Sequence, residues 1–231
     1  MKEFNFEEFI DPYRVDLIKS GPSRYYNYEY VIKKLVAKNK PLVIVETGTM
    51  HSNLEDNQGA FTLVFADLIK NWTGGRLITI DISEKSIENC KKTTKDFAEI
   101  IEYVTSDSVS YLESLTDEEV AAIDYIYFDS YDLWLPDPTP SQLHHYRELA
   151  AVYKRLSHDV ILSVDDNFLP GSWVEWIAYN SNGEPYSTRC DIGTRIIGKG
   201  TLIDFFLLQE GWNRYDDFLH VSTVHMLTYE K

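Results

Sequence analysis

Several short apolar runs in this chain end in an acidic residue, and this repeated pattern constrains the fold more than any other feature. In the clearest case residues 42–45 are all apolar, and Glu46 follows them directly. A short run without polar alternation is typical of a strand that is buried on both faces of a parallel sheet. The other largely apolar runs cover residues 77–80, 123–128 and 160–164, and the acids that follow them are Asp81, Asp129 and Asp165.

Segments with helical spacing separate these runs. The apolar positions predict helices over residues 59–69, 83–97, 141–156 and 201–210. A further strand is predicted over residues 101–105, and a closing antiparallel hairpin over residues 212–215 and 219–229. Strands that alternate with helices predict an α/β fold: a doubly wound, Rossmann-like, mainly parallel sheet with right-handed connections and a C-terminal antiparallel hairpin.

The chain divides into an N-terminal helical segment and one larger domain. Residues 1–40 are helical and aromatic, and we expect them to pack on the sheet domain or cap it as a lid. Residues 41–231 form the Rossmann-like domain, with insertions at residues 51–58 and 168–198. Residues 51–58 are polar and rich in turn-forming residues, which is typical of a loop. Residues 168–198 carry glycine, proline and polar residues with some aromatics, and their pattern assigns no helix or strand.

The net charge of −15, from 22 basic and 37 acidic residues, narrows the choice of partners. Such a surface repels phosphate backbones and anionic membranes, so we expect a small-molecule substrate, no nucleic acid and no membrane. Cys90 and Cys190 form no metal-ligand pair, and the acidic, broken N-terminus does not resemble a signal peptide. We therefore expect a cytoplasmic protein. The sequence does not decide between a monomer and a homo-oligomer.

The acids that end the strands should share one crevice, because the carboxyl ends of parallel strands meet at one edge of the sheet. Like charges that lie close raise each other's pKa unless a cation or a hydrogen-bond donor is present. A ligand rich in hydroxyls and amines, together with a divalent metal, would meet this requirement.

The order of these residues resembles that of class I S-adenosylmethionine-dependent methyltransferases. The resemblance covers residues 42–167, and the motifs that carry it are Glu46-Thr47-Gly48-Thr49, Asp81, Asp107-Ser108 and Asp129. It implies the fold already described and S-adenosylmethionine as the cofactor. One departure is the glycine loop: this chain has Gly48 and then Gly59, with residues 51–58 between them, where the family has closely spaced glycines.

By this resemblance, each motif has a place around the cofactor. Glu46, Gly48 and Thr49 would lie near its amino acid end. Asp81 would bind the ribose hydroxyls, as a carboxylate does in dinucleotide folds. The remaining cofactor residues would be Asp107 and Ser108, which flank the adenine, and Asp129.

A narrower resemblance concerns two strand ends. Residues 127–132 and 164–167 resemble the magnesium sites of catechol O-methyltransferase-like and macrocin O-methyltransferase-like enzymes. The resemblance implies Asp129, Asp166 and Asn167 as Mg²⁺ ligands, with Asp165 as a competitor, and oxygen ligands suit this ion. The metal would lower the pKa of the substrate hydroxyl. Alternatively, residues 165–167 form a turn.

The sequence offers several candidates for the catalytic base. Asp132 stands where the catechol enzymes have a lysine, so Asp129, Asp132 and His144 are the catalytic candidates. His145 and His51 are further candidates for the base. A histidine titrates near neutral pH, although histidines on helix surfaces are usually structural.

The function that these features favour is a Mg²⁺-assisted O-methyltransferase that uses S-adenosylmethionine and acts on a sugar or phenolic hydroxyl. A non-catalytic S-adenosylmethionine-binding protein is an alternative, since the expected lysine is missing. A nicotinamide-dependent Rossmann oxidoreductase is a weaker alternative, because no GxGxxG follows the first strand.

Overall fold

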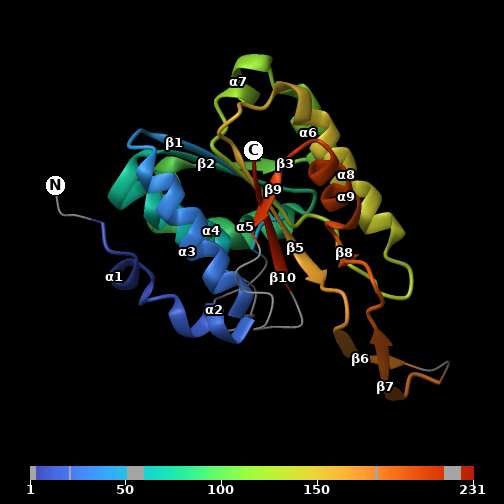
Figure 1. The fold of residues 1–231 in the computed structure, drawn as a ribbon. Coiled ribbons are helices and arrows are strands. Elements are labelled where there is room, and N and C mark those ends of the chain that lie inside the picture. The colour runs from blue at the N-terminus through green and yellow to red at the C-terminus, as the bar shows by residue number, and fades with distance from the viewer. Residues whose placement is uncertain (1–3, 21, 51–59, 180–181, 216–224) are drawn as a thin grey trace.

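The computed structural model describes residues 4–20, 22–50, 60–179, 182–215 and 225–231. Its main sheet runs in the order β3-β2-β1-β4-β5-β10-β9, with β8 paired to the end of β5 (Figure 1). The strands are β1 Leu42–Thr47, β2 Gly75–Asp81, β3 Ile101–Thr105, β4 Tyr125–Phe128, β5 Ile161–Phe168, β8 Ile197–Gly198, β9 Asn213–Tyr215 and β10 His225–Glu230. Strands β1 to β5 are parallel, and β10 is antiparallel to both β5 and β9, which confirms the predicted fold class.

The register of the strands brings the predicted acids to one edge. Thr47 of β1 pairs with Ile80 of β2 and with Phe128 of β4, and Phe128 pairs with Val164 of β5. The residues that follow these pairs therefore share the carboxyl edge of the sheet. Those residues include Gly48, Asp81, Asp129 and Asp165.

Helices cover both faces of the sheet (Figure 1). Ile44 belongs to a buried cluster with residues of α3 and α4, whereas its neighbour Val45 packs with residues of α8 and α9 on the other face. This explains the uninterrupted apolar run, because alternate residues of a strand point to opposite faces. The helices are α1 Phe6–Ile10, α2 Arg14–Ser20, α3 Pro22–Ala37, α4 Phe61–Leu68, α5 Glu84–Thr93, α6 Ser108–Ser114, α7 Asp117–Ala121, α8 Thr139–Val152 and α9 Thr201–Gln209.

The predicted helix over residues 83–97 ends earlier than expected. Ser83, the first residue of the predicted range, caps α5 by accepting a hydrogen bond from the backbone N–H of Ser86. The α-helix ends at Thr93, and a 3-10 helix, Lys95–Ile100, leads into β3.

None of the helices in the described residues is long and apolar enough to cross a membrane.

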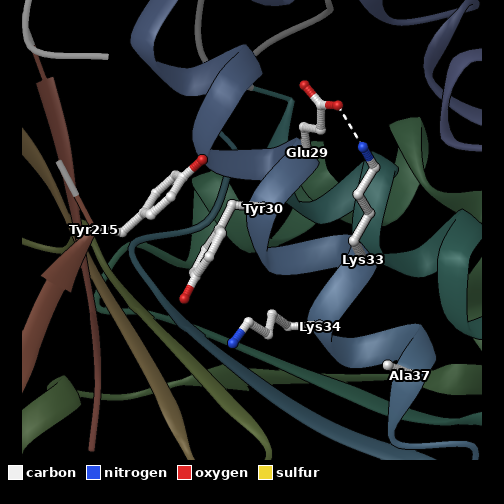
Figure 2. Close-up of a pocket in the computed structure, with 6 residues that line it drawn as sticks. All are labelled: Glu29, Tyr30, Lys33, Lys34, Ala37 and Tyr215. Atoms are coloured by element: carbon white, nitrogen blue, oxygen red, sulfur yellow. Dashed lines mark hydrogen bonds and ion pairs between the residues drawn. The ribbon is translucent and has the colours of Figure 1, made fainter. Parts of the chain in front are cut away.

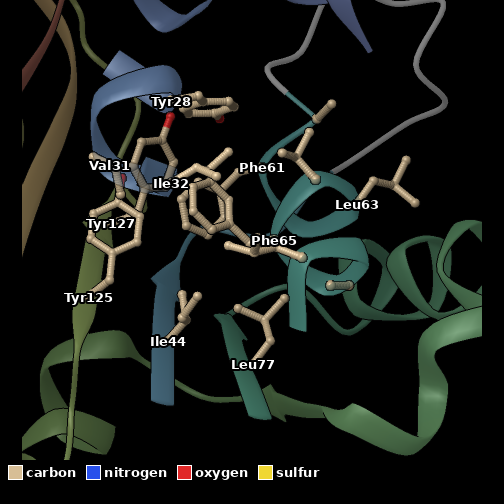
Figure 3. Packing of buried hydrophobic residues seen from close by; sticks show 14 of the residues in the cluster. Tyr28, Val31, Ile32, Ile44, Phe61, Leu63, Phe65, Leu77, Tyr125 and Tyr127 are labelled. Carbon is tan, nitrogen blue, oxygen red and sulfur yellow. The ribbon is translucent and has the colours of Figure 1, made fainter. Parts of the chain in front are cut away.

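The N-terminal helix α3 packs directly on the sheet domain. Tyr28 is fully buried and lies edge-on to Phe65 of α4, with ring centroids 5.3 Å apart (Figure 3). Asn27 is buried too, and its amide donates to the backbone carbonyl of Met226 in β10 over 2.8 Å. Helix α3 is therefore part of the core.

Helix α3 also meets the far edge of the sheet. The rings of Tyr30 and Tyr215 of β9 stack with centroids 3.7 Å apart, beside a surface hollow of about 340 Å³ (Figure 2). Aromatic stacking of this kind adds to the free energy gained by burial alone.

The predicted insertion at residues 168–198 contains a β-hairpin of its own. Strands β6, Trp173–Tyr179, and β7, Pro185–Asp191, pair with each other in a separate two-stranded sheet (Figure 1). After the hairpin the chain returns to the main sheet as β8. The predicted loop at residues 51–58, with His51, lies outside the described residues.

Candidate active site

Glu46 lies near the end of β1 and is 2% exposed. The hydroxyls of Thr62 in α4 and Thr79 in β2 both donate to its Oε2, over 2.7 and 2.6 Å. Burial raises the pKa of Glu46 to about 8, even though the two hydroxyl bonds oppose the shift. Glu46 thus connects β1 to α4 and to β2. Its predicted place near the cofactor stays a prediction.

Gly48 allows two loops at the sheet edge to touch. Its φ is +80°, and a Cβ at this position would lie 2.4 Å from the backbone oxygen of Asp129 and 2.8 Å from the Cα of Ser130. Only glycine fits both the backbone conformation and the close approach. The glycine therefore brings the loop after β1 against the loop after β4.

Asp81 ends β2 and faces the same loop. Its Oδ2 accepts a hydrogen bond from the backbone N–H of Thr49 over 3.2 Å, and its Oδ1 accepts one from the N–H of Ser83 over 2.7 Å. Each carboxylate oxygen can accept a further bond. Beside it, the Thr49 hydroxyl is buried without a hydrogen-bond partner among the described residues. Asp81 and Thr49 thus retain hydrogen-bonding capacity that no described residue of the chain satisfies.

The predicted adenine residues have structural contacts. Asp107 is the N-cap of α6, and its Oδ1 accepts from the backbone N–H of Ser110 over 2.9 Å. This bond holds the pKa of Asp107 below its usual value. The Ser108 hydroxyl lies 3.0 Å from Nε2 of His144 in α8, and the same nitrogen lies 3.5 Å from Oε1 of Glu148. The His144 ring therefore connects α8 to α6, which is a structural role.

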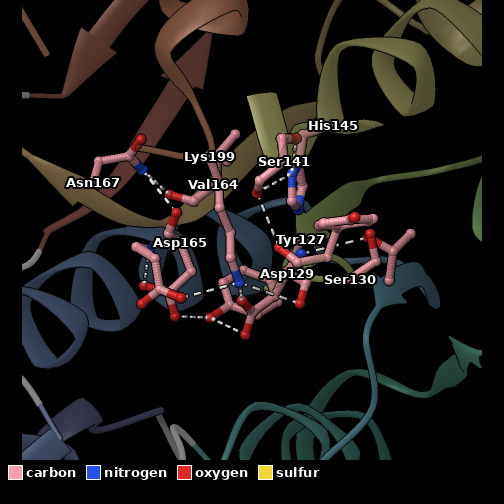
Figure 4. A network of polar contacts seen from close by, with 12 residues as sticks. Tyr127, Asp129, Ser130, Ser141, His145, Val164, Asp165, Asn167 and Lys199 are labelled. Atoms are coloured by element: carbon pink, nitrogen blue, oxygen red, sulfur yellow. Dashed lines mark hydrogen bonds and ion pairs between the residues drawn. The ribbon is translucent and has the colours of Figure 1, made fainter. Parts of the chain in front are cut away.

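The second half of the site is a cluster of charged residues at the ends of β4 and β5 (Figure 4). The ammonium group of Lys199 pairs with Asp129 and lies 3.0 Å from Oδ2 of Asp166. Lys199 is 2% exposed, whereas the two carboxylates keep 30% and 33% of their side-chain exposure. The structure thus brings Asp129 and Asp166 together, as expected, but around a lysine.

A second cation completes the cluster. Nε of Arg24, in α3, lies 2.7 Å from Oδ2 of the buried Asp165, and its Nη2 lies 3.3 Å from Oδ1 of Asp166. The hydroxyl of Tyr127 also donates to Asp165. The N-terminal segment therefore supplies a charged residue to the sheet edge.

The charges of the cluster shift one another's pKa. Burial raises the pKa of Asp129, with Lys199 opposing and the other two acids adding to the shift. At Asp166 burial acts in the same direction, but Lys199 and Arg24 outweigh it and hold the pKa below its usual value. Asp129 is thus the carboxylate of the pair that more readily takes up a proton.

The Asn167 side chain binds backbone groups, and its predicted role as a metal ligand stays a prediction. Its Nδ2 donates to the backbone carbonyls of Val164 and Asp165, both over 2.9 Å, and its Oδ1 accepts from the N–H of Gly200 over 2.7 Å. The side chain therefore fastens the turn after β5 to the segment before α9.

The charged cluster as a whole does not fit a magnesium site. The predicted ligand oxygens of Asp129 and Asp166 face an ammonium group, and Asp165 faces a guanidinium. A divalent ion at this position would meet two positive charges, which disfavours its binding. In the part of the chain that the structure describes, no group of three or more His, Cys, Asp or Glu side chains is arranged to hold a metal.

The other candidates for the base lie at different depths. His145 is buried; its Nδ1 lies 2.7 Å from the backbone carbonyl of Ser141, and burial lowers its pKa to about 4. Its Nε2 has no hydrogen-bond partner among the described residues. Asp132 is exposed in the loop between β4 and α8. These contacts leave Asp129 as the candidate at the carboxyl edge of the sheet.

Two residues of the cluster, Arg24 and Lys199, were not expected from the sequence. Arg24 is an ordinary helix residue 141 positions from its partner. Lys199 carries one signal, the glycines on either side: a Cβ on Gly198 would lie 2.3 Å from the backbone oxygen of Asp166. Such a close approach requires glycine, so the Gly-Lys-Gly segment could have been read as a site of contact.

Comparison with known proteins supports the fold. No protein-family model matches the chain, and no curated protein matches its sequence. Its structure is similar to that of a candidate rRNA methylase from Clostridium thermocellum, with 14% identity and a TM-score of 0.52 over 90% of this chain and 97% of that one. It is also similar to a candidate methyltransferase from Streptococcus mutans solved with SAH, with 12% identity and a TM-score of 0.51 over 88% of this chain and 96% of that one. The chain therefore has the class I methyltransferase fold.

Proposed function

We propose that this chain transfers a methyl group from S-adenosylmethionine to a hydroxyl group of a small molecule. The observation that carries the proposal is the sheet edge where the loop at Gly48 touches the loop at Asp129, with Asp81 beside it. In open α/β sheets, ligands bind at this edge. The two structural neighbours described above are both named as methylases or methyltransferases.

The residues after β1 and β2 fit such a cofactor. Asp81 has acceptor capacity left on both oxygens, which suits two vicinal ribose hydroxyls. The buried hydroxyl of Thr49, which has no partner among the described residues, is a second polar group for the ligand. S-adenosylmethionine, when bound, supplies a methyl group activated by a positively charged sulfur.

Asp129 is the group that we assign as the general base. Its Oδ1 is held by Lys199, and its side chain keeps enough exposure to meet an acceptor. Asp129 would accept the proton of the acceptor hydroxyl at Oδ2 while the hydroxyl oxygen bonds to the methyl carbon and the carbon–sulfur bond breaks. A carboxylate whose pKa is raised towards neutrality is suited to this task.

The acceptor that fits best is a neutral or cationic small molecule with a sugar or phenolic hydroxyl. The cluster carries three carboxylates against two cations, and the chain as a whole carries −15. This charge disfavours anionic acceptors and nucleic acid. The proposed reaction includes no step through Mg²⁺, because the predicted ligands of this ion bind protein cations and backbone groups instead.

A methyl-transfer assay tests the proposal. The purified chain is incubated with isotope-labelled S-adenosylmethionine and a panel of sugar and phenolic acceptors, and labelled product is measured. Asp129→Asn should lower kcat by about a hundredfold or more, the usual scale for loss of a general base. Asp132→Asn is the matched control, because Asp132 is exposed in the same loop region, and it should keep activity near the wild-type rate.

Two outcomes would contradict the assignment. Undiminished transfer by Asp129→Asn would remove Asp129 as the base. Tight cofactor binding without transfer to any acceptor would favour a non-catalytic S-adenosylmethionine-binding protein.

A further inference from the structure

The ammonium group of Lys199 lies between Asp129 and Asp166, where the sequence predicted a divalent ion. Nζ of Lys199 pairs with Asp129, lies 3.0 Å from Oδ2 of Asp166, and lies 3.5 Å from the backbone oxygen of Asp129. An ammonium group has three donors and no acceptor, so these three oxygens match its full capacity. The group thus joins two strand ends by its charge, as a bound cation does.

The backbone around Lys199 holds the ammonium group in this place. The N–H of Lys199 donates to the carbonyl of Asp166 over 3.3 Å, and the next N–H, of Gly200, donates to Oδ1 of Asn167 over 2.7 Å. Gly198 makes the approach possible, since any side chain there would collide with the backbone of Asp166. A lysine built in at 2% exposure is positioned by the fold and is not a chance surface contact.

The charge balance of the cluster agrees with this arrangement. Asp129, Asp165 and Asp166 face Lys199 and Arg24, which leaves a single negative charge. Without Lys199 the three carboxylates would face Arg24 alone, which leaves two unbalanced negative charges. Oxygen ligands with surplus negative charge are what Mg²⁺ and Mn²⁺ prefer.

We propose that Lys199 is a resident cation that takes the place of a divalent metal, so that the acceptor site of this chain is complete without Mg²⁺. The role of Lys199 in catalysis rests on the proposed methyl transfer, whereas the exclusion of metal follows from the charges of the cluster alone. The expectation of a magnesium-assisted reaction is replaced by one in which the ammonium group holds Asp129 and Asp166 in position. Lys199 is therefore a positioning residue for Asp129.

Metal binding by the purified chain tests the proposal without substrate or cofactor. Binding of Mn²⁺ and Mg²⁺ is measured by calorimetry and by the thermal shift in EDTA against added metal. The wild-type chain should show no saturable site at low millimolar metal. Lys199→Met keeps the aliphatic stem and removes the charge, and it should bind one Mn²⁺ at least about tenfold more tightly than wild type, because a unit charge at ~4 Å is removed.

Two further variants serve as controls. Lys199→Arg retains the charge and should bind metal as poorly as wild type. Adding Asp166→Asn to Lys199→Met should abolish the new site. One saturable metal per wild-type chain, lost in Asp166→Asn, would overturn the proposal, and so would a well-folded Lys199→Met that binds metal no better than wild type.

The wild-type measurement decides the matter even if Lys199→Met does not fold. Binding of S-adenosylhomocysteine, measured on the same samples, separates this proposal from the proposed function. A chain that excludes metal and binds no cofactor would contradict only the latter. A chain that binds the cofactor and also a metal at Asp166 would contradict only the resident cation.

Discussion

Replacing Gly48 with alanine should damage the site and the stability of the protein together. At φ +80° an L-residue costs about 1–2 kcal/mol relative to glycine. The new Cβ would also lie 2.4, 2.7 and 2.8 Å from backbone atoms of Asp129 and Ser130, which cannot rotate away. Relieving such a collision by moving backbone costs about 1–3 kcal/mol more, so Gly48→Ala should lose roughly 2–5 kcal/mol of unfolding free energy.

Gly211 provides a matched control for this prediction. It has the same φ of +80°, but a Cβ there would meet nothing within 4 Å. Gly211→Ala should therefore lose only the conformational part, about 1–2 kcal/mol. Urea unfolding of both variants measures the difference, and binding of S-adenosylhomocysteine should weaken in Gly48→Ala alone. Equal losses of stability in the two variants would refute the claim that Gly48 is required by contact with the loop after β4.

Two other predictions concern buried carboxyl groups. The pKa of Glu46 rises from 4.5 in the unfolded chain to about 8 in the folded one, so the folded state holds this proton more tightly, and stability should fall as pH rises from about 4.5 to about 8. Glu46→Gln should remove a few kcal/mol of that fall, and unfolding measured at pH 5 and pH 9 checks it; a variant with the wild-type slope would contradict the assignment. The buried carboxylate of Asp124 accepts from Lys38 over 3.1 Å, from Lys40 over 2.9 Å and from the N–H of Val43 over 3.1 Å. Asp124→Ala should cost about 1–3 kcal/mol in urea unfolding, because it leaves the backbone N–H of Val43 without its acceptor, while Lys38 keeps Asp159 as a partner. A loss below about 0.5 kcal/mol would show that these contacts contribute as little as exposed ion pairs.

The strand ends were predictable from the sequence because local pattern and topology agree there. A run such as residues 42–45 identifies a buried strand, and parallel strands place the residues after Thr47, Ile80 and Phe128 at one edge. The resemblance predicted Gly48 near the cofactor, and in the structure its backbone closely approaches the loop at Asp129.

The composition of the charged cluster was not predictable in the same way. Arg24 and Lys199 reach it from a helix before the first strand and from a segment after the hairpin β6–β7, and no local pattern links them to the acids. Asn167 has its amide bound to backbone because β8 returns to pair with β5, a long-range event. The acids alone therefore predicted a metal, whereas the fold supplies its own cations.

The most direct test of a cofactor site at the carboxyl edge of the sheet is calorimetric binding of S-adenosylhomocysteine to the wild-type chain and to Asp81→Ala. We expect saturable binding at one site, weakened at least about tenfold in Asp81→Ala, since hydrogen bonds to a charged group contribute about 1.5–3 kcal/mol. Asp117→Ala, which removes an exposed acid from α7, should bind as wild type does. Equal binding by wild type and a folded Asp81→Ala, or no binding by the wild-type chain, would contradict the claim that this sheet edge is a cofactor site.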